Sequence, residues 1–262
     1  MNETEPNQPE PSPRRALIAP RTIPGNRAFA WFGAASKLVR LAPGAWILTM
    51  LTWFVLILVA KVIPVVGLLF DALTSQIWLG GLFIGCAVAS YGGMFHQKFL
   101  FEAFSSHLVP LALFSAMMTG IELTALHLIV GPEVWEIFLQ TVSQQQQTSA
   151  AQEIPPEMFN QIVAARMWVI PINAVLMFVP VLVVLHNLSL SQAIKLSAKG
   201  FFANPAAMLR FFLVVAAFAI LALLSFGLTL VILIPLYIAA IYFAHLDIFT
   251  AEESSNDGQW QA

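Results

Sequence analysis

The order of apolar and polar residues along the chain predicts an all-α polytopic membrane protein. A helix needs about 20 mostly apolar residues to cross the hydrocarbon core of a bilayer. Six stretches meet this requirement, and we number them first to sixth in chain order: residues 45–63, 68–90, 108–130, 164–186, 205–225 and 228–248. The sequence therefore predicts six transmembrane helices, paired as three hairpins.

The division of the last apolar stretch into two spans needs an argument of its own. Residues 211–246 contain no Asp, Glu, Lys or Arg, and they are too numerous for one span. Tilting accommodates only a modest excess of length. Ser225, Phe226 and Gly227 lie near the middle of the stretch, so we expect a turn there. In the fourth and sixth spans, Pro171, Pro180 and Pro235 predict kinks.

A short amphipathic helix is predicted before each odd-numbered span. The three segments are 27–41, 97–106 and 189–202, and the last begins with a capping box formed by Ser189 and Gln192. Helices of this kind lie in the membrane interface with their apolar face toward the lipid. The resulting pattern of helix, span, turn and span occurs three times. It indicates either an internal repeat or the linkers that any hairpin protein needs.

The segments outside the spans predict two tails and one insert. Residues 1–26 contain six prolines and no apolar region, so they do not form a signal peptide and are predicted to be a disordered tail. Residues 251–262 are interpreted in the same way, which leaves 27–250 as the membrane domain. Gly131 and Pro132 are expected to end the third span. An insert over 131–161 then starts a helix on the outer face.

Composition and charge narrow the class of partner. The chain is 59% hydrophobic and 10% charged, whereas soluble domains carry about 25% charged residues. Its formal net charge of −2 offers no basic field for nucleic acid. We therefore expect membrane lipids as partners, with a membrane-protein partner or a second copy of the chain as further candidates, and no nucleic acid.

The distribution of Lys and Arg predicts the orientation. Basic residues gather on the cytoplasmic side of membrane proteins. With both termini inside, that side holds the basic residues Arg14, Arg15, Arg21, Arg27, Lys37, Arg40, Lys98, Lys195 and Lys199. The outer side then holds Lys61 and Arg166. The expected location is a plasma membrane, with the N- and C-termini in the cytoplasm.

Two groups of polar residues at membrane depth are candidate sites, because ionisable groups in spans are costly. The first is a predicted pair of Glu122 and Arg166 on the third and fourth spans, which either fixes helix packing or relays a proton or substrate. The second lies at the cytoplasmic ends of the spans and contains His107, His186, Arg210, His245 and Asp247. It either binds a metal, headgroup or anion, or consists of polar side chains tolerated at the interface.

Gly81, Gly85 and Ala89 form a face of small residues on the second span. Such a face lets another helix approach closely, within the chain or in a dimer. The sequence contains none of the usual hydrolase, zinc, redox, phosphate-loop or dinucleotide motifs. We therefore predict that the protein is not an enzyme and has no metal site or cofactor.

Four segments resemble a family of uncharacterised proteobacterial six-span inner-membrane proteins. They are residues 37–46 (KLVRLAPGAW), 80–86 (GGLFIGC), 179–197 (VPVLVVLHNLSLSQAIKLS) and 244–249 (AHLDIF). The likeness extends, more distantly, to the membrane domain of glycerophosphodiester phosphodiesterases. It implies a six-span fold in the bacterial inner membrane and no particular reaction.

These observations support two functional hypotheses. The first is a non-enzymatic assembly, scaffolding or envelope factor that binds lipid or a membrane-protein partner. The alternative is a small transporter or lipid-handling protein that uses Glu122 in a bundle of kinked helices.

Overall fold

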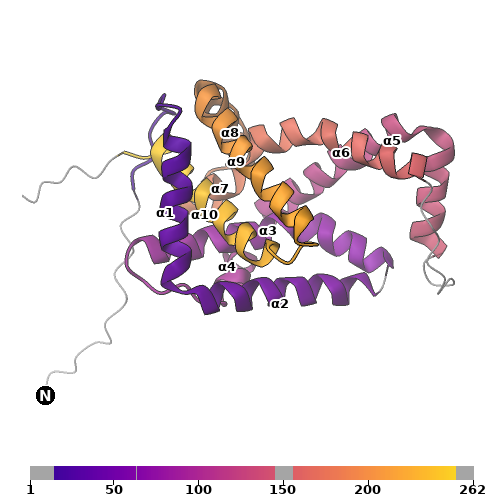
Figure 1. The fold of residues 1–262 in the computed structure, drawn as a ribbon, viewed down its shortest axis with the longest axis horizontal. Helices are drawn as coiled ribbons and strands as arrows, with labels where there is room; N and C mark the ends of the chain where they lie inside the picture. The colour runs from indigo at the N-terminus through magenta and orange to yellow at the C-terminus, as the bar shows by residue number, and fades with distance from the viewer. Residues whose placement is uncertain (1–14, 63, 145–155, 252–262) are drawn as a thin grey trace, which may run out of the picture.

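The computed structural model describes residues 15–62, 64–144 and 156–251, and this part of the chain is almost entirely helical (Figure 1). Six of its helical segments are long and apolar enough to span a membrane. In these residues the only pairing of extended backbone is a single bridge between Leu17 and Thr250. The prediction of an all-α polytopic membrane protein is confirmed.

Each predicted span overlaps one observed helix or, for the fourth span, two consecutive helices. They correspond to α2 (Pro43–Lys61), α3 (Pro64–Ser90), α5 (Leu108–Gln144), α6 (Pro156–Leu176) with α7 (Val179–His186), α9 (Pro205–Leu224) and α10 (Leu230–Phe249). The short helices α1 (Arg27–Leu41), α4 (Phe99–Ser106) and α8 (Leu190–Ala203) precede the odd-numbered spans. The capping box of α8 is present, since the backbone N–H of Ser189 donates to Gln192 Oε1 at 3.1 Å.

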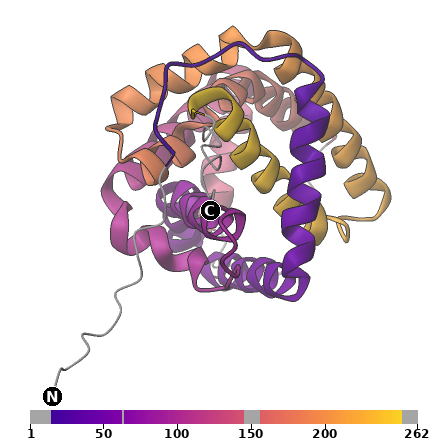
Figure 2. The same cartoon turned by 90° about the vertical axis from the view of Figure 1, so that its left-hand side faces the viewer.

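The spans differ in how deeply they lie within the bundle. The apolar window of α10 is 61% buried and that of α3 is 50% buried, against 17% for α2 and for α9. Helix α1 packs across α10 on one side, and the two ribbons lie next to each other in Figure 2. Helices α3, α7 and α10 thus form the core, while α2 and α9 expose most of their surface.

The third span does not end at Gly131 and Pro132, as the sequence had suggested. Helix α5 continues through Pro132 to Gln144. A proline removes one hydrogen bond and crowds the carbonyl four residues before it. A proline can therefore bend a helix without ending it. In Figure 1, α5 changes direction toward its far end. The predicted outer helix is therefore a continuation of the third span, and residues 145–155 of the insert lie outside the described residues.

The fourth span consists of two helices, because Met177 and Phe178 interrupt it. Pro180 lies in the first turn of α7, whereas Pro171 is accommodated inside α6. Ser197 of α8 hydrogen-bonds to two backbone groups at the break. Its Oγ donates to the carbonyl of Val175 at 2.7 Å and accepts from the N–H of Phe178 at 3.3 Å.

The turn predicted between the fifth and sixth spans is present. Phe226 and Gly227 both have positive φ, at 51° and 84°, which reverses the chain after α9. Helices α9 and α10 are therefore separate spans.

Residues 15–26 were predicted to be part of a disordered tail, and for this stretch the prediction is wrong. They form an extended segment, which we call the strap, lying against the C-terminal end of α10. The N–H of Ile18 donates to the carbonyl of Phe249 at 2.8 Å, and the N–H of Arg21 donates to that of Ile248 at 3.0 Å. Prolines exclude a helix here but allow an extended chain to pair. Residues 1–14 and 252–262 lie outside the described part.

Because the strap pairs with residues 248–251, both ends of the described chain lie at the same end of the bundle. We call this the strap end.

Candidate ligand site at the strap end

A cavity of about 240 Å³ lies at the strap end, between α3, α4, α7 and α10. The first residue of the strap, Arg15, forms part of its wall. The lining residues with polar side chains are Arg15, Tyr91, Glu102, Ser106, His107, His186, Tyr242, His245 and Thr250. Aliphatic side chains complete the wall, among them Ile84, Val88 and Val184. The cavity is therefore amphipathic, with polar groups and hydrocarbon facing the same space.

Two of the predicted histidines meet in this wall. His186, the last residue of α7, and His245 of α10 bring their Nε2 atoms within 2.8 Å of each other. At this distance one ring donates the hydrogen bond and the other accepts it. His245 is only 1% exposed, and within the described chain its Nδ1 has no hydrogen-bond partner. The pair is thus anchored through Nε2 of His245, and Nδ1 makes no hydrogen bond of normal geometry in the described chain, although the ring also interacts with the backbone of Tyr242.

The third histidine approaches from the junction of α4 and α5. His107 Nε2 lies 2.8 Å from Asn187 Oδ1, and its Nδ1 lies 2.8 Å from Ser106 Oγ. Asn187 ends α7 in the left-handed conformation, with φ of 52°, which asparagine tolerates better than most residues. The turn after α7 therefore fixes the orientation of His107.

Six of the nine polar lining residues were not among the predicted site residues, and two of the six, Tyr242 and Arg15, matter most for the chemistry of the cavity. Tyr242 lies three positions before His245 on α10, so both occupy one face of the helix, and its hydroxyl is 2.6 Å from Ser90 Oγ. That spacing was a usable signal. The sequence contains no comparable signal for Arg15, because the position of this residue depends on the backbone pairing of the strap with residues 248–251. Its Nε is buried and has no hydrogen-bond partner in the described chain.

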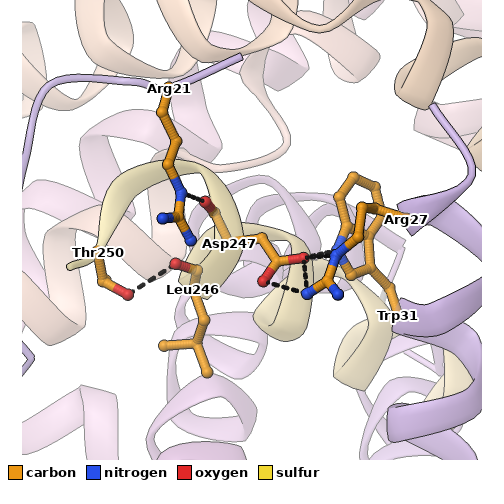
Figure 3. A network of polar contacts seen from close by, with 6 residues as sticks. All are labelled: Arg21, Arg27, Trp31, Leu246, Asp247 and Thr250. Carbon is orange, nitrogen blue, oxygen red and sulfur yellow. Dashed lines mark hydrogen bonds and ion pairs between the residues drawn. The ribbon is translucent and has the colours of Figure 1, made fainter. Parts of the chain in front are cut away.

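Asp247 belongs to a separate network that fastens α1 and the strap to α10 (Figure 3). Its carboxylate accepts from Trp31 Nε1 at 2.7 Å and from Arg27 Nε and Nη2, each at 2.8 Å. The guanidinium of Arg21 donates to the backbone carbonyl of the same residue. Bidentate contacts of this kind are directional, so Asp247 fixes the position of α1 and the strap against α10 and does not line the cavity.

Arg210 lies apart from both groups. It is exposed on α9, and its guanidinium lies so close to Gly25 that a Cβ there would come within 1.7 Å of it. Of the five residues predicted to cluster, the structure thus brings together His107, His186 and His245 around one cavity. It places Asp247 and Arg210 elsewhere at the same end.

The predicted pair of Glu122 and Arg166 lies on α5 and α6, which pack against each other. Glu122 is half-buried and lines neither of the two cavities described in this section. The side chain of Arg166 lies outside the described residues, so the pairing stays a prediction.

The small face of α3 packs within the chain. A Cβ at Gly81 would lie 2.2 Å from the carbonyl oxygen of Phe99, and one at Gly85 would lie 2.6 Å from the ring of Phe95. Ala89 is 4% exposed. The face therefore receives α4 and the loop before it.

A second cavity, also of about 240 Å³, lies deeper between α3, α5, α6 and α10. It is lined by Gln76, Asn173 and Tyr237 together with apolar side chains. Nowhere in the described residues do three His, Cys, Asp or Glu side chains gather as a metal site would require.

Comparison of the chain with family models, with curated proteins and with solved structures found no match. The functional argument therefore rests on the geometry of the two cavities.

Proposed function

We propose that the protein is a non-enzymatic membrane factor that binds a membrane lipid in the cavity at the strap end. The observation that carries this proposal is the amphipathic lining of that cavity. Histidine, arginine and tyrosine side chains line the same space as Ile84 and Val88. Ligand pockets commonly combine an apolar lining with a few oriented polar groups, and a lipid presents both kinds of surface.

The chemistry of the cavity favours binding over catalysis. Hydrolysis of a lipid needs an acid and a base that converge on one bond. The one carboxylate in the lining is Glu102, which is exposed on α4. The buried groups are His245 and Tyr242, whose side chains already hydrogen-bond to His186 and Ser90.

A cavity-filling substitution tests the proposal. We expect Ala87→Phe, on the cavity wall, to remove lipid that co-purifies with the wild-type protein, as measured by native mass spectrometry from mild detergent. The matched control is Ala116→Phe, which adds the same ring at an exposed position of α5. If the Ala87→Phe protein folds and keeps the same bound lipid as the control, the cavity is not the lipid site.

The proposal includes a location. The protein lies in a bacterial inner membrane with the strap end in the cytoplasm, and α1, α4 and α8 lie in that interface. The excess of basic residues at this end supports the orientation. Lys195 and Lys199 are exposed on α8, where they can meet anionic headgroups.

A second candidate is a transporter or lipid-handling protein, favoured by the deeper cavity next to the break in the fourth span. Polar groups at membrane depth and broken helices are common at transport sites. In this hypothesis Glu122 serves as the ionisable group. If Glu122→Gln leaves uptake, efflux and lipid-flipping rates equal to those of the wild type, this candidate fails.

A further inference from the structure

The cavity at the strap end contains two buried nitrogens that make no hydrogen bond of normal geometry within the described chain. They are Nε of Arg15 and Nδ1 of His245, which come from opposite ends of the sequence. A buried donor left unsatisfied destabilises the folded state, so such groups in a native protein call for an explanation. A ligand that supplies hydrogen-bond acceptors would satisfy both.

The histidine pair can present a donor to such a ligand. Because His186 and His245 share one hydrogen bond through their Nε2 atoms, one tautomer of His245 accepts at Nε2 and carries its proton on Nδ1. In that tautomer Nδ1 donates. An anion in the cavity would select this state, since its oxygens only accept.

Charge and size agree with a phosphate-bearing ligand. Arg15 is the one permanently charged cation in the lining, and guanidinium groups match phosphate oxygens in geometry. A cavity needs only about 10–15 Å³ to hold one water molecule. The volume of about 240 Å³ therefore has room for a phosphate ester with adjoining carbons.

We infer that this cavity binds the phosphate group of an anionic ligand through donors from Arg15 and His245. The inference rests on the proposed function and specifies its ligand as negatively charged. Glu102 on the exposed rim opposes the anion, but solvent screens its charge. Tyr91, His107, His186 and Tyr242 add further hydrogen-bonding side chains to the same lining.

Arg15 couples ligand binding to the strap. It lies at the beginning of a segment whose amides at Ile18 and Arg21 donate to the carbonyls of Phe249 and Ile248. A ligand that contacts Arg15 binds the docked strap better than the undocked one, so it shifts the equilibrium toward docking. Binding is therefore expected to slow hydrogen exchange at these two amides.

The test uses the full chain in phosphatidylcholine nanodiscs, titrated with short-chain phosphatidylglycerol. We expect Arg15→Gln to weaken binding about tenfold, the loss typical of one charge-assisted hydrogen bond. Glu102→Gln, which removes the opposing charge, should tighten it. The control Lys199→Gln removes a cation at the same end but outside the cavity, and it should leave the affinity unchanged. A smaller loss of affinity with Arg15→Lys than with Arg15→Gln would support the site by showing that its positive charge contributes to binding.

A competition experiment distinguishes a free phosphate ligand from a lipid headgroup. Displacement of bound phosphatidylglycerol by inorganic phosphate at millimolar concentration would indicate a site that takes free phosphate, whereas binding that inorganic phosphate does not displace would indicate a site for the lipid headgroup. Both results support the anion site. The inference is overturned if Arg15→Gln and Lys199→Gln bind anionic lipid equally and the exchange of the strap amides does not respond.

The two proposals fail separately. Suppose that Ala87→Phe removes bound lipid, while Arg15→Gln changes neither the affinity for anionic lipid nor the hydrogen exchange of the strap amides. The cavity then binds lipid whatever the charge of its headgroup. If Ala87→Phe has no effect on lipid, the proposed function itself is wrong.

Discussion

At the scale of single residues, Asp247 joins more of the chain than any other side chain in its network. Its carboxylate receives donors from Arg27 and Trp31 of α1, while its backbone carbonyl receives Arg21 of the strap. The side chain is 17% exposed, whereas that of Arg27 is 49% exposed. The ion pair alone therefore contributes little, and the buried bond from Trp31 contributes more.

We expect Asp247→Asn to lower the free energy of unfolding by about 1–2 kcal/mol, because the neutral amide accepts these hydrogen bonds less strongly. The measurement is chemical unfolding in mild detergent. Asp71→Asn, at an exposed position of α3, is the matched control and should change stability by less than about 0.5 kcal/mol. Equal effects of the two substitutions would show that the network does not stabilise the fold.

At the scale of elements, close contacts fix how helices approach one another. Gly81 lies against backbone, since the nearest atoms to an added Cβ are the carbonyl oxygens of Phe99 and Leu100. Backbone atoms cannot turn aside as a flexible side chain can. By contrast, an added Cβ at Gly33 in α1 meets nothing within 4 Å.

Gly81→Ala is expected to destabilise the protein by about 2 kcal/mol or more, because α3 and α4 must separate. Gly33→Ala should be neutral or stabilising by up to about 1 kcal/mol, through the higher helix propensity of alanine. Thermal unfolding of both variants in the same detergent provides the comparison. A stable Gly81→Ala protein would contradict the close packing of α3 against α4.

The break in the fourth span gives a second prediction at this scale. Ser197 is fully buried and hydrogen-bonds to the carbonyl of Val175 near the end of α6 and to the N–H of Phe178 in the break. Replacing it with alanine leaves these groups unpaired, so Ser197→Ala should cost about 1–3 kcal/mol of unfolding free energy. Ser191→Ala, at an exposed position of the same helix, should cost little. Thermal melts of the two proteins would separate these outcomes.

The elements that could be predicted from the sequence are those fixed by local pattern. Apolar length located the spans, and Ser189 with Gln192 located the start of α8. The path of α5 through Pro132 could not be predicted, since a proline either bends or ends a helix depending on the packing around it.

The candidate site was predictable only in part, because it joins segments that are distant in sequence. The histidines could be placed at one depth from their positions at span ends. Which of them meet depends on how α7 and α10 pack, and that packing brings His186 to His245 while turning Asp247 toward α1. The contribution of Arg15 follows from long-range backbone pairing, which no local pattern encodes.

At the scale of the whole molecule, the strap end and the turn between α9 and α10 lie at opposite ends of the sixth span. Leu228 in that turn is 81% exposed, and Lys199 is exposed near the strap end. The one cysteine, Cys86, is buried, so it should not react with a bulky maleimide.

This arrangement allows the proposed orientation to be measured in intact cells. With a membrane-impermeant maleimide, we expect Leu228→Cys to be labelled from outside, and Lys199→Cys only after permeabilisation. The wild-type protein, with Cys86 alone, serves as the unlabelled control. The reverse pattern would place the strap end outside and contradict the proposal.

The pairing of the strap with residues 248–251 also sets the order of events during synthesis. Arg15 leaves the ribosome early, yet its neighbours Ile18 and Arg21 find their acceptors only after the sixth span has been made. Contacts between segments so distant in the chain form late. Docking of the strap therefore marks a bundle whose six spans are all in place.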